Sequence, residues 1–349
     1  MGITKKRFDY LDLLRIIACF LVIMNHTQGY INCFSYAEGS SFASVAFKLT
    51  VGMLIKMNVP IFFMISGTLL LNKDYELRDL LKKAIRFFLI LLGFSLVANF
   101  SYKGHLYISG FIRQFITAKV DGAGPYWYLY AYIGLLLILV FLRYITKELS
   151  YKETVYLLLL RLVITGILPM MFVFMNRYSS SGFYVAAEFN PAIILSDCIF
   201  YPIIGYGLDR CLDIASIKRR GFIALLAAFT GTVVIEAFLT WYEGPGANFS
   251  GLDFAMTCSF FLIIKYVLTI KPFSEQISKA LAGISKLTFG IYLLDPIIGN
   301  FLKPLVHGLY PNVIPHLLLT SVIYCILSMT VCGVLAWLWG FMRRVIMKR

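Results

Sequence analysis

Residues 7–27, RFDYLDLLRIIACFLVIMNHT, form an apolar segment that carries Asp12 and Arg15 near one end and Asn25 and His26 near the other. Such groups are costly in the hydrocarbon of a bilayer, and where they occur within a span they are candidates for a functional site. The whole chain is apolar: 60% of its 349 residues are hydrophobic, 14% are charged, and the mean hydropathy is +0.80. This composition excludes an ordinary soluble globule and indicates a polytopic membrane protein.

Apolar runs near the length of about 20 residues that a helical span needs recur along the chain. They predict an all-α bundle of about ten transmembrane helices. Residues 41–57, SFASVAFKLTVGMLIKM, precede the second run and could be an interfacial helix or the outer half of the same span. The ten expected spans are 11–29, 58–71, 84–98, 126–144, 155–175, 191–208, 222–241, 252–270, 287–305 and 314–342.

The placement of Lys and Arg predicts orientation, because cytoplasmic loops hold most of the basic residues next to spans. With the N-terminus inside, about two thirds of the 32 basic residues fall on the cytoplasmic side, and both termini are then cytoplasmic. In this arrangement Lys48 and Lys56 lie on the outer side, and Arg161 and Lys265 are expected to snorkel from near span ends. The net charge of +14 then reflects orientation beside anionic headgroups, and no nucleic acid is expected as a partner.

The domain organisation follows from the absence of long polar connections. No internal repeat and no linker that could separate a soluble domain is visible, so residues 1–349 are expected to form a single transmembrane domain. The seven cysteines and four histidines do not follow the spacing of a metal site, and no metal is expected. Residues 24–33, MNHTQGYINC, offer no small-x-small cleavage site of a removable signal peptide.

Arg15 and His26 share a helix face. They are eleven residues apart, which on an α-helix is three turns plus about 20°, or about 16 Å along the axis. Asp12 precedes Arg15 by three residues and can pair with it. The stripe joins a fixed cation near the cytoplasmic end to an imidazole that can act as a base near neutral pH. A purely structural interpretation stays open, with Arg15 at the inner headgroups and His26 bonded across helices.

Three further runs carry candidate functional residues. KKAIRF (82–87) places Lys82, Lys83 and Arg86 at the cytoplasmic start of the third span, where Lys83 and Arg86 share a face. Such groups could hold a phosphate-bearing ligand, although membrane orientation also accounts for them. VPIFFMISGTLLL (59–71) contains the pair Ser66–Gly67, which lets another backbone approach closely. GPYWYLYAYIG (124–134) places Trp127 and Tyr128 in an interfacial aromatic belt.

Taken together, these runs resemble the acyltransferase 3 family of integral-membrane acyltransferases, which move acyl groups onto envelope sugars and related acceptors. The resemblance rests on LDLLRIIACFLVIMNH with Arg15 and His26, then on FFMISG, KKAIRF, YWYLYAYIGLLLIL and ISKLTFGIYLLDP (284–296). These pieces cover the chain in order, and the ten-span count agrees with the family. The resemblance implies a multi-pass protein of a bacterial inner or plasma membrane.

The resemblance also implies a chemistry. A cytosolic acyl-CoA, most often acetyl-CoA, would place its phosphates on Arg15, Lys83 and Arg86, with Lys82 beside them, and its thioester near His26. His26 would act as general base on an acceptor hydroxyl or carry the acyl group covalently, and the sequence leaves both routes open. The acceptor would be an envelope glycan or a small hydroxyl compound.

Asp295 stands where many members of the family have His. It could orient an imidazole, bind an acceptor hydroxyl or pair with Lys303, or it could simply begin a helix break before Pro296. We count it with His26 as a candidate catalytic residue.

Further candidates and a competing function complete the interpretation. Glu236 lies near the outer end of the seventh expected span, where an exported acceptor would arrive. The competing class is transport of a small solute such as an amino acid, since buried charges also line solute paths. The family resemblance also leaves open a part in polysaccharide export. The candidates for acceptor binding or support are Asn25, Ser66, Trp127, Tyr128 and Glu236.

Overall fold

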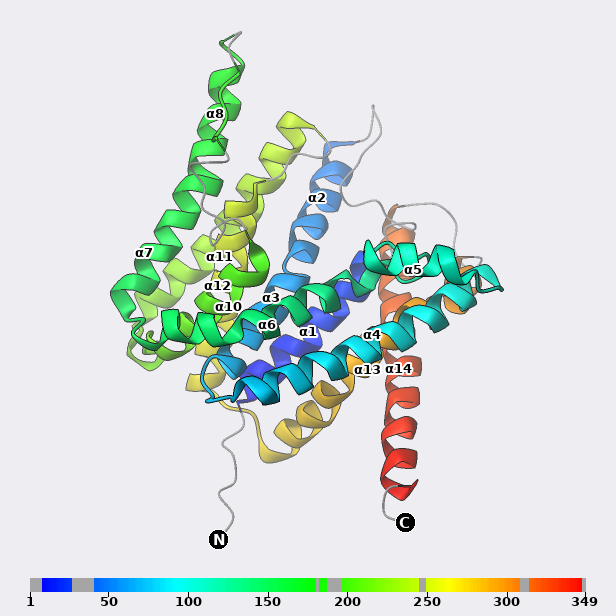
Figure 1. Cartoon of the computed structure of the whole chain (residues 1–349). Coiled ribbons are helices and arrows are strands. Elements are labelled where there is room, and N and C mark those ends of the chain that lie inside the picture. Colours follow the sequence, from blue (N-terminus) through cyan, green and yellow to red (C-terminus); the bar gives the residue numbers. More distant parts are fainter. Residues whose placement is uncertain are drawn as a thin grey trace. The chain divides into compact units, whose positions relative to one another are not determined.

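A computed structural model describes residues 8–26, 41–179, 182–186, 196–244, 249–307 and 314–346, without the side chains of 307, 314–318 and 342–346. The described residues contain helices and no strand (Figure 1). The elements are α1 (Asp9–Asn25), α2 (Phe42–Lys56), α3 (Asn58–Leu70), α4 (Leu77–Lys103), α5 (Ile108–Ile116), η1 (Gly124–Tyr126), α6 (Trp127–Lys147), α7 (Tyr151–Leu162), η2 (Val163–Ile167), α8 (Leu168–Asn176), α10 (Asp197–Arg210), η4 (Ile214–Ser216), α11 (Arg219–Glu243), α12 (Ser250–Ile270), α13 (Glu275–His307) and α14 (Ile314–Ile346).

Eight helical segments in the described part of the chain are long and apolar enough to cross a membrane. The prediction of an all-helical, polytopic membrane protein is therefore confirmed. The two other expected spans correspond to α1, with 17 residues, and α10, with 14 residues. Both are shorter than a typical span of about 20 residues, and both adjoin stretches outside the described ranges. The cytoplasmic position of the termini stays a prediction.

The segment before the second expected span belongs to that span. Helices α2 and α3 together form one apolar segment of 29 residues, Phe42–Leu70. Of the two alternatives, the outer half of the same span is thus favoured over a separate interfacial helix. The segment is interrupted at Met57, and Lys56 lies near its middle. The position expected from the sequence was the outer side.

The described contacts divide the chain into two compact units. Unit 1 comprises Met1–Ala18, Phe34–Leu69 and Leu149–Lys286, and unit 2 comprises Cys19–Cys33, Leu70–Glu148 and Leu287–Arg349. Because the segments of the two units alternate along the sequence, neither unit is a contiguous half of the chain. The single domain over residues 1–349 stays a prediction.

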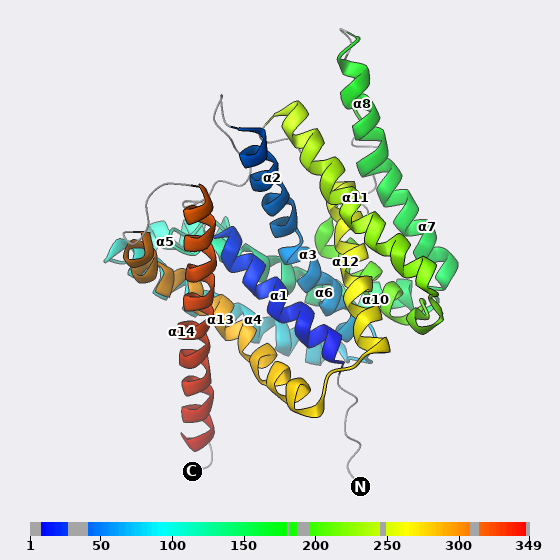
Figure 2. The ribbon, with the colours of Figure 1, turned by 180° about the vertical axis from the view of Figure 1, so that it is seen from behind.

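In unit 1, α11 packs along α12 and α2 (Figure 2). Helices α7 and α8 continue each other through the π-helical turn η2. Helices α3 and α10 cross at very close range: a Cβ at Gly67 would overlap the backbone of Pro202, and a Cβ at Gly205 would overlap the backbone of Met64. At this crossing the Thr68 hydroxyl donates to the Gly205 carbonyl, 3.0 Å away. The sequence prediction that Ser66–Gly67 admits a neighbouring backbone is confirmed.

The crossing of α3 and α10 makes Gly67 sensitive to a single added methyl group. We expect Gly67→Ala to lower the free energy of unfolding by about 1–3 kcal/mol, because the added Cβ meets backbone atoms that no side-chain rotation can move. The midpoint of thermal unfolding in detergent measures the change. Gly231→Ala in α11 is the matched control, since a Cβ there meets nothing within 4 Å. Equal midpoints for the two variants would contradict the close crossing.

Two basic residues of unit 1 differ from their expected placement. Arg161 and Lys265 were expected to snorkel, but both are buried. Arg161 donates to Asp197, 2.7 Å away, and lies against the rings of Phe200, Tyr201 and Phe254. The Lys265 ammonium donates to backbone carbonyls at the end of α10 and pairs with Asp209 at 3.1 Å. The prediction was wrong because the partners come from other helices.

In unit 2, α4 and α6 lie side by side, with the short α5 packed on α4 (Figure 1). Helix α5 buries Phe111 and Phe115, and the Tyr130 hydroxyl of α6 donates to the Phe115 carbonyl at 2.8 Å. The end of α1 from Cys19, the greater part of α13 and the whole of α14 belong to the same unit. Unit 2 therefore contains both His26 and Asp295.

Candidate active site

The centre of the candidate site is a contact between an imidazole and a carboxylate. His26 directly follows the last residue of α1, and Asp295 lies within α13. The Nδ1 atom of His26 is 2.8 Å from Oδ2 of Asp295. The His26 side chain keeps 16% of its surface exposed, whereas that of Asp295 keeps 2%. The carboxylate is thus enclosed, while part of the ring stays accessible.

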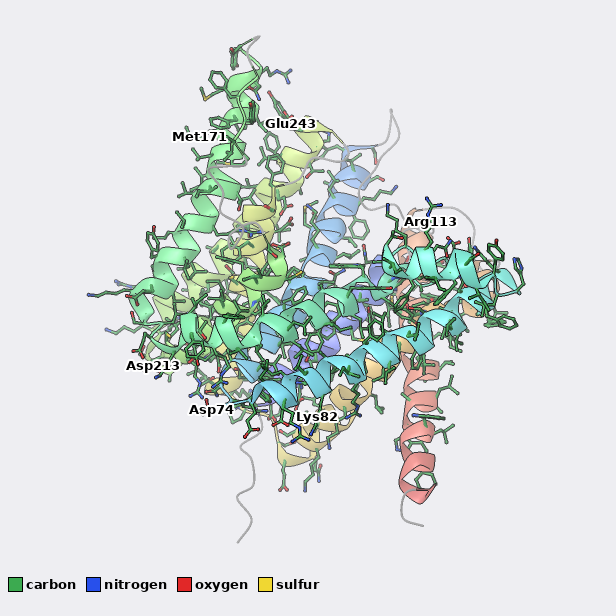
Figure 3. The ribbon with its side chains drawn as sticks, viewed as in Figure 1. Asp74, Lys82, Arg113, Met171, Asp213 and Glu243 are labelled. Carbon is green, nitrogen blue, oxygen red and sulfur yellow. The ribbon has the colours of Figure 1, made fainter. Side chains whose placement is uncertain are left out.

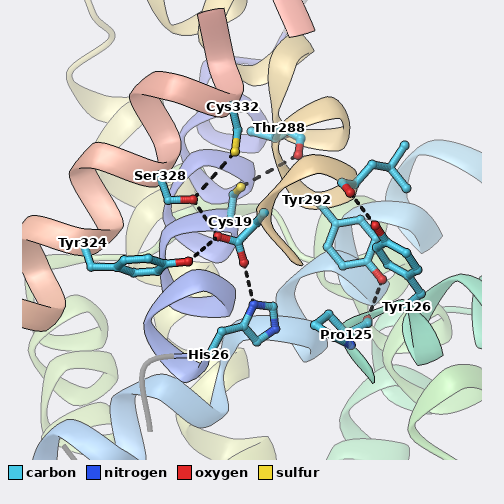
Figure 4. Close-up of polar contacts among 11 residues, drawn as sticks. Cys19, His26, Pro125, Tyr126, Thr288, Tyr292, Tyr324, Ser328 and Cys332 are labelled. Carbon is cyan, nitrogen blue, oxygen red and sulfur yellow. Dashed lines mark hydrogen bonds and ion pairs between the residues drawn. The ribbon is translucent and has the colours of Figure 1, made fainter. Parts of the chain in front are cut away.

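Helix α14 supplies further hydrogen bonds to Asp295. The Ser328 hydroxyl donates to Oδ1 at 2.6 Å, and the Tyr324 hydroxyl donates to the same atom at 3.3 Å. One turn farther along α14, Cys332 contacts the Ser328 hydroxyl at 3.8 Å (Figure 4). A buried carboxylate is stable only when donors satisfy its oxygens, and here α1 and α14 both contribute donors.

The sequence interpretation missed these α14 residues. Tyr324, Ser328 and Cys332 are spaced four residues apart, which places them on one face of a helix. That spacing is a weak signal in an apolar span, because small and aromatic residues occur there for packing alone. It gains meaning only once Asp295 is known to face the same helix.

The contact with an ionised Asp295 carboxylate assigns different roles to the two ring nitrogens of His26. An ionised carboxylate can only accept hydrogen bonds, so Nδ1 carries the proton in the contact with Asp295. In the neutral ring Nε2 is then the unprotonated nitrogen, with a lone pair available for a proton or an electrophile. A carboxylate in this position also stabilises the positive charge that the ring acquires when Nε2 takes up a proton.

Of the alternatives for Asp295, the structure favours orientation of an imidazole. Helix α13 continues through Pro296 and Pro304, so the alternative in which Asp295 begins a helix break before Pro296 is wrong. Hydrogen bonds from aromatic side chains surround this stretch: the Tyr126 hydroxyl donates to the Leu293 carbonyl at 2.5 Å, and the Tyr292 hydroxyl donates to the Pro125 carbonyl at 2.6 Å (Figure 4). These bonds tie η1, directly before α6, to α13 next to Asp295.

Arg15 lies in unit 1, three turns before His26 on α1. Its guanidinium is 3.3 Å from the Asp12 carboxylate, which confirms the predicted pairing, and 3.4 Å from the Ser285 hydroxyl. The side chain is 28% exposed. The Asp12 carboxylate balances the charge of Arg15, so what Arg15 offers a ligand is mainly its hydrogen-bond donors.

The basic residues of the third expected span lie in unit 2, in the first turns of α4. Lys82 and Arg86 are exposed, and Lys82 projects from the helix surface (Figure 3). Lys83 is half-buried, with its ammonium 5.7 Å from the centre of the Tyr75 ring. The helix places Lys83 and Arg86 on one face, as the spacing predicted.

The candidates for acceptor binding or support divide between the units. In unit 2, Asn25 is half-buried beside His26, Trp127 is 48% exposed at the start of α6, and the Tyr128 ring lies 6.0 Å from that of Tyr292. In unit 1, the Ser66 hydroxyl donates to Phe62 of its own helix, 2.8 Å away. Glu236, expected where an exported acceptor would arrive, has no exposed surface and bonds to Lys56 in unit 1.

Comparisons with known proteins agree with the motifs. Neither a search of curated proteins nor a search of solved structures finds a match. A family profile, described as an acyltransferase domain, matches residues 8–337. This range covers nearly the whole chain and includes His26, Asp295 and all five runs that carry the resemblance. The chain therefore belongs to the acyltransferase 3 family and is a membrane acyltransferase.

Proposed function

We propose that this protein transfers an acyl group, most often acetyl, from a cytosolic acyl-CoA to a hydroxyl group of an envelope carbohydrate or related acceptor. The observation that carries the proposal is the 2.8 Å contact between His26 Nδ1 and Asp295 Oδ2 in a chain of this family. The contact leaves Nε2 of a partly exposed imidazole free to act on a substrate. Family membership supports the reaction class, and the contact supports His26 as the group that performs it.

The proposed reaction needs one base. Nε2 of His26 removes the proton of the acceptor hydroxyl while the hydroxyl oxygen attacks the thioester carbonyl. The new C–O bond forms, the C–S bond breaks, and the proton passes from the imidazolium to the departing thiolate, which yields an ester and CoA. Asp295 does not touch the substrate; it holds the ring and stabilises the imidazolium. In the alternative route, Nε2 attacks the thioester carbonyl, the C–S bond breaks and the CoA thiolate leaves, so that the acyl group rests on His26. The acceptor hydroxyl then attacks this acyl group, the C–N bond breaks, and the hydroxyl proton ends on the thiolate. Both routes start from the same neutral ring.

The proposed donor site uses basic side chains. CoA carries phosphate groups, and Arg and Lys bind phosphate through charge-assisted hydrogen bonds. Lys83 and Arg86 lie on one face of α4, with Lys82 next to them, and Arg15 lies on the helix that leads to His26. The 16 Å expected between Arg15 and His26 along α1 suits an extended arm between the phosphates and the thioester, at about 1.5 Å per residue.

The proposed acceptor and location follow from the predicted orientation. Basic residues at the predicted cytoplasmic end would meet a cytosolic donor, and the lipid bilayer of a bacterial inner or plasma membrane would hold the protein. Trp127 and Tyr128, at the start of α6 in the same unit as His26, offer aromatic surface and a hydroxyl to a carbohydrate.

The test of the proposed function is turnover of acetyl-CoA by the purified protein in lipid vesicles. Release of free thiol and equilibrium binding of acetyl-CoA are measured in parallel, with an extract of envelope glycans as acceptor. We expect saturable binding and acceptor-dependent thiol release. Failure of well-folded protein to bind acetyl-CoA would overturn the donor assignment. Acyl-CoA-independent uptake of a small solute, measured in the same vesicles, would favour transport instead.

The basic residues of α4 give a separate prediction. We expect the double replacement Lys83→Gln and Arg86→Gln to raise the KM for acetyl-CoA by about tenfold or more with a small change in kcat, because charge-assisted hydrogen bonds contribute about 1.5–3 kcal/mol each. Acetyl-pantetheine, which lacks the phosphates, should show the same kinetics with wild type and variant. The control is Lys279→Gln, since Lys279 is exposed and pairs with Glu275. An unchanged KM would remove Lys83 and Arg86 from the donor site.

A further inference from the structure

Unit 1 contains a buried group of charges that the proposed acyl transfer does not use. The Lys56 ammonium, near the middle of the α2–α3 segment, is 2.5 Å from Glu236 Oε1 on α11 and 3.4 Å from Asp253 Oδ1 on α12. The side chain of Glu236 has no exposed surface, and those of Lys56 and Asp253 keep 20% and 16%. All three residues lie in helices that are long and apolar enough to cross a membrane.

The charges of this group do not balance if every member is ionised. One ammonium faces two carboxylates, which leaves one excess negative charge. A neighbouring ion pair in the same unit, Arg161 of α7 with Asp197 of α10, brings no net charge, and Tyr201 of α10 lies beside Arg161. An uncompensated charge among apolar helices is costly, so the group needs one more positive charge.

Orphaned oxygen atoms on the two carboxyl groups indicate where that charge is needed. Glu236 Oε2 and Asp253 Oδ1 are both buried and have no hydrogen-bond partner within the described part of the chain, although Asp253 Oδ1 lies 3.4 Å from the Lys56 ammonium. An ionised carboxylate oxygen in that condition bears the full cost of desolvation, whereas a protonated oxygen becomes a donor. Because both carboxyl groups contact the same ammonium, a donor on Glu236 has the Asp253 carboxylate as a nearby acceptor.

The fully buried position of Glu236 restricts the occupant to something small. The described residues contain no group of three or more His, Cys, Asp or Glu that could hold a metal ion. A proton requires no space of its own and supplies one positive charge. We propose that Glu236 and Asp253 together bind one proton at neutral pH, so that their cluster with Lys56 is neutral within the membrane-spanning helices.

The position of the site gives the proton a structural consequence. Lys56 is the last residue of α2, directly before the interruption at Met57. The interruption places a lysine inside an apolar segment, where only a neutral cluster is tolerated at low cost. The bound proton therefore lowers the cost of placing Lys56 at the interruption near the middle of the α2–α3 segment.

The test is infrared spectroscopy of the protein in a detergent without ester groups at neutral pH, which detects the carbonyl-stretching band of a protonated carboxyl group. We expect the wild type to show a band equal to one acid group per chain that is absent from both Glu236→Gln and Asp253→Asn. Loss in the second variant is expected because a neutral amide in place of the Asp253 carboxylate leaves Glu236 balanced by Lys56 alone. Glu243→Gln, at the exposed end of the same helix (Figure 3), is the matched control and should retain the band.

A third variant tests for the same proton and leaves both carboxyl groups in place. In Lys56→Met the cluster has lost its ammonium, so both carboxyl groups should be protonated and the band should grow about twofold. Monodisperse elution confirms that each chain is folded before its spectrum is compared. Absence of the band in wild type, its persistence in Glu236→Gln or Asp253→Asn, or an unchanged band in Lys56→Met would each overturn the proposal.

Discussion

Replacement of His26 by alanine is expected to reduce acyl transfer to the level of vesicles without protein, while acetyl-CoA still binds. The imidazole is the base in the proposed reaction, and general acid–base catalysis by a positioned side chain contributes roughly 10²- to 10⁴-fold to a rate. Lys83 and Arg86 of α4 are proposed to bind the phosphates of the donor, so the loss of the ring leaves those contacts in place. Thiol release and equilibrium binding, measured on the same preparation, separate the two effects.

The matched control for this variant is His105→Ala. His105 is exposed in the connection between α4 and α5, and its Nδ1 atom contacts the Lys103 carbonyl at 3.0 Å. We expect its removal to leave turnover unchanged. Undiminished turnover by His26→Ala would place the base elsewhere. Loss of binding together with turnover, in a variant that unfolds at the wild-type temperature, would show that His26 contributes to the donor site itself.

Much of the fold could be predicted because the bilayer restricts the answer. A chain in hydrocarbon has to satisfy its backbone hydrogen bonds within each segment, so long apolar runs become helices. The eight membrane-length helices correspond to eight of the ten expected spans. The i,i+3 pairing of Asp12 with Arg15 could also be predicted, because both residues lie on one helix and their spacing fixes the geometry.

Contacts between helices could not be predicted in the same way. Arg161 and Lys56 each have an acidic partner far away in the sequence, Asp197 and Glu236, and no local pattern relates the members of either pair. A single sequence shows that a charged residue lies in an apolar run but not which helix faces it. Snorkelling was therefore the natural expectation for Arg161, and the outer side was the natural expectation for Lys56.

The same limit applies to the candidate site. The resemblance to the family directed attention to His26 and to Asp295, but it left four interpretations of the aspartate open. The 2.8 Å contact between Nδ1 of His26 and Oδ2 of Asp295 favours orientation of the imidazole. The sequence could not show this contact, because the two residues are 269 positions apart. The hydroxyl groups of Ser328 and Tyr324 donate to Oδ1, the other oxygen of the same carboxylate.

Asp295→Asn is expected to lower kcat by up to about 10⁴-fold with little change in the KM for acetyl-CoA, the size of effect that this replacement has in a serine-protease triad. The Asn amide can donate to Nδ1 and so favours the ring with its proton on Nε2, where it cannot act as a base. The variant also lacks the negative charge that stabilises the imidazolium. The pH dependence of kcat should change with the rate, because the ring that titrates has lost its charged partner.

Ser328→Ala separates this positioning role from a merely structural one. It removes one hydrogen bond to Oδ1 but keeps the charge of Asp295 and its contact with His26, so turnover should fall far less than in Asp295→Asn. If Asp295 only stabilised the fold, both variants would lower the unfolding temperature and leave the pH profile of the remaining activity unchanged. If Asp295 orients His26, the Asn variant loses rate and alters the pH profile even when its unfolding temperature equals that of the wild type.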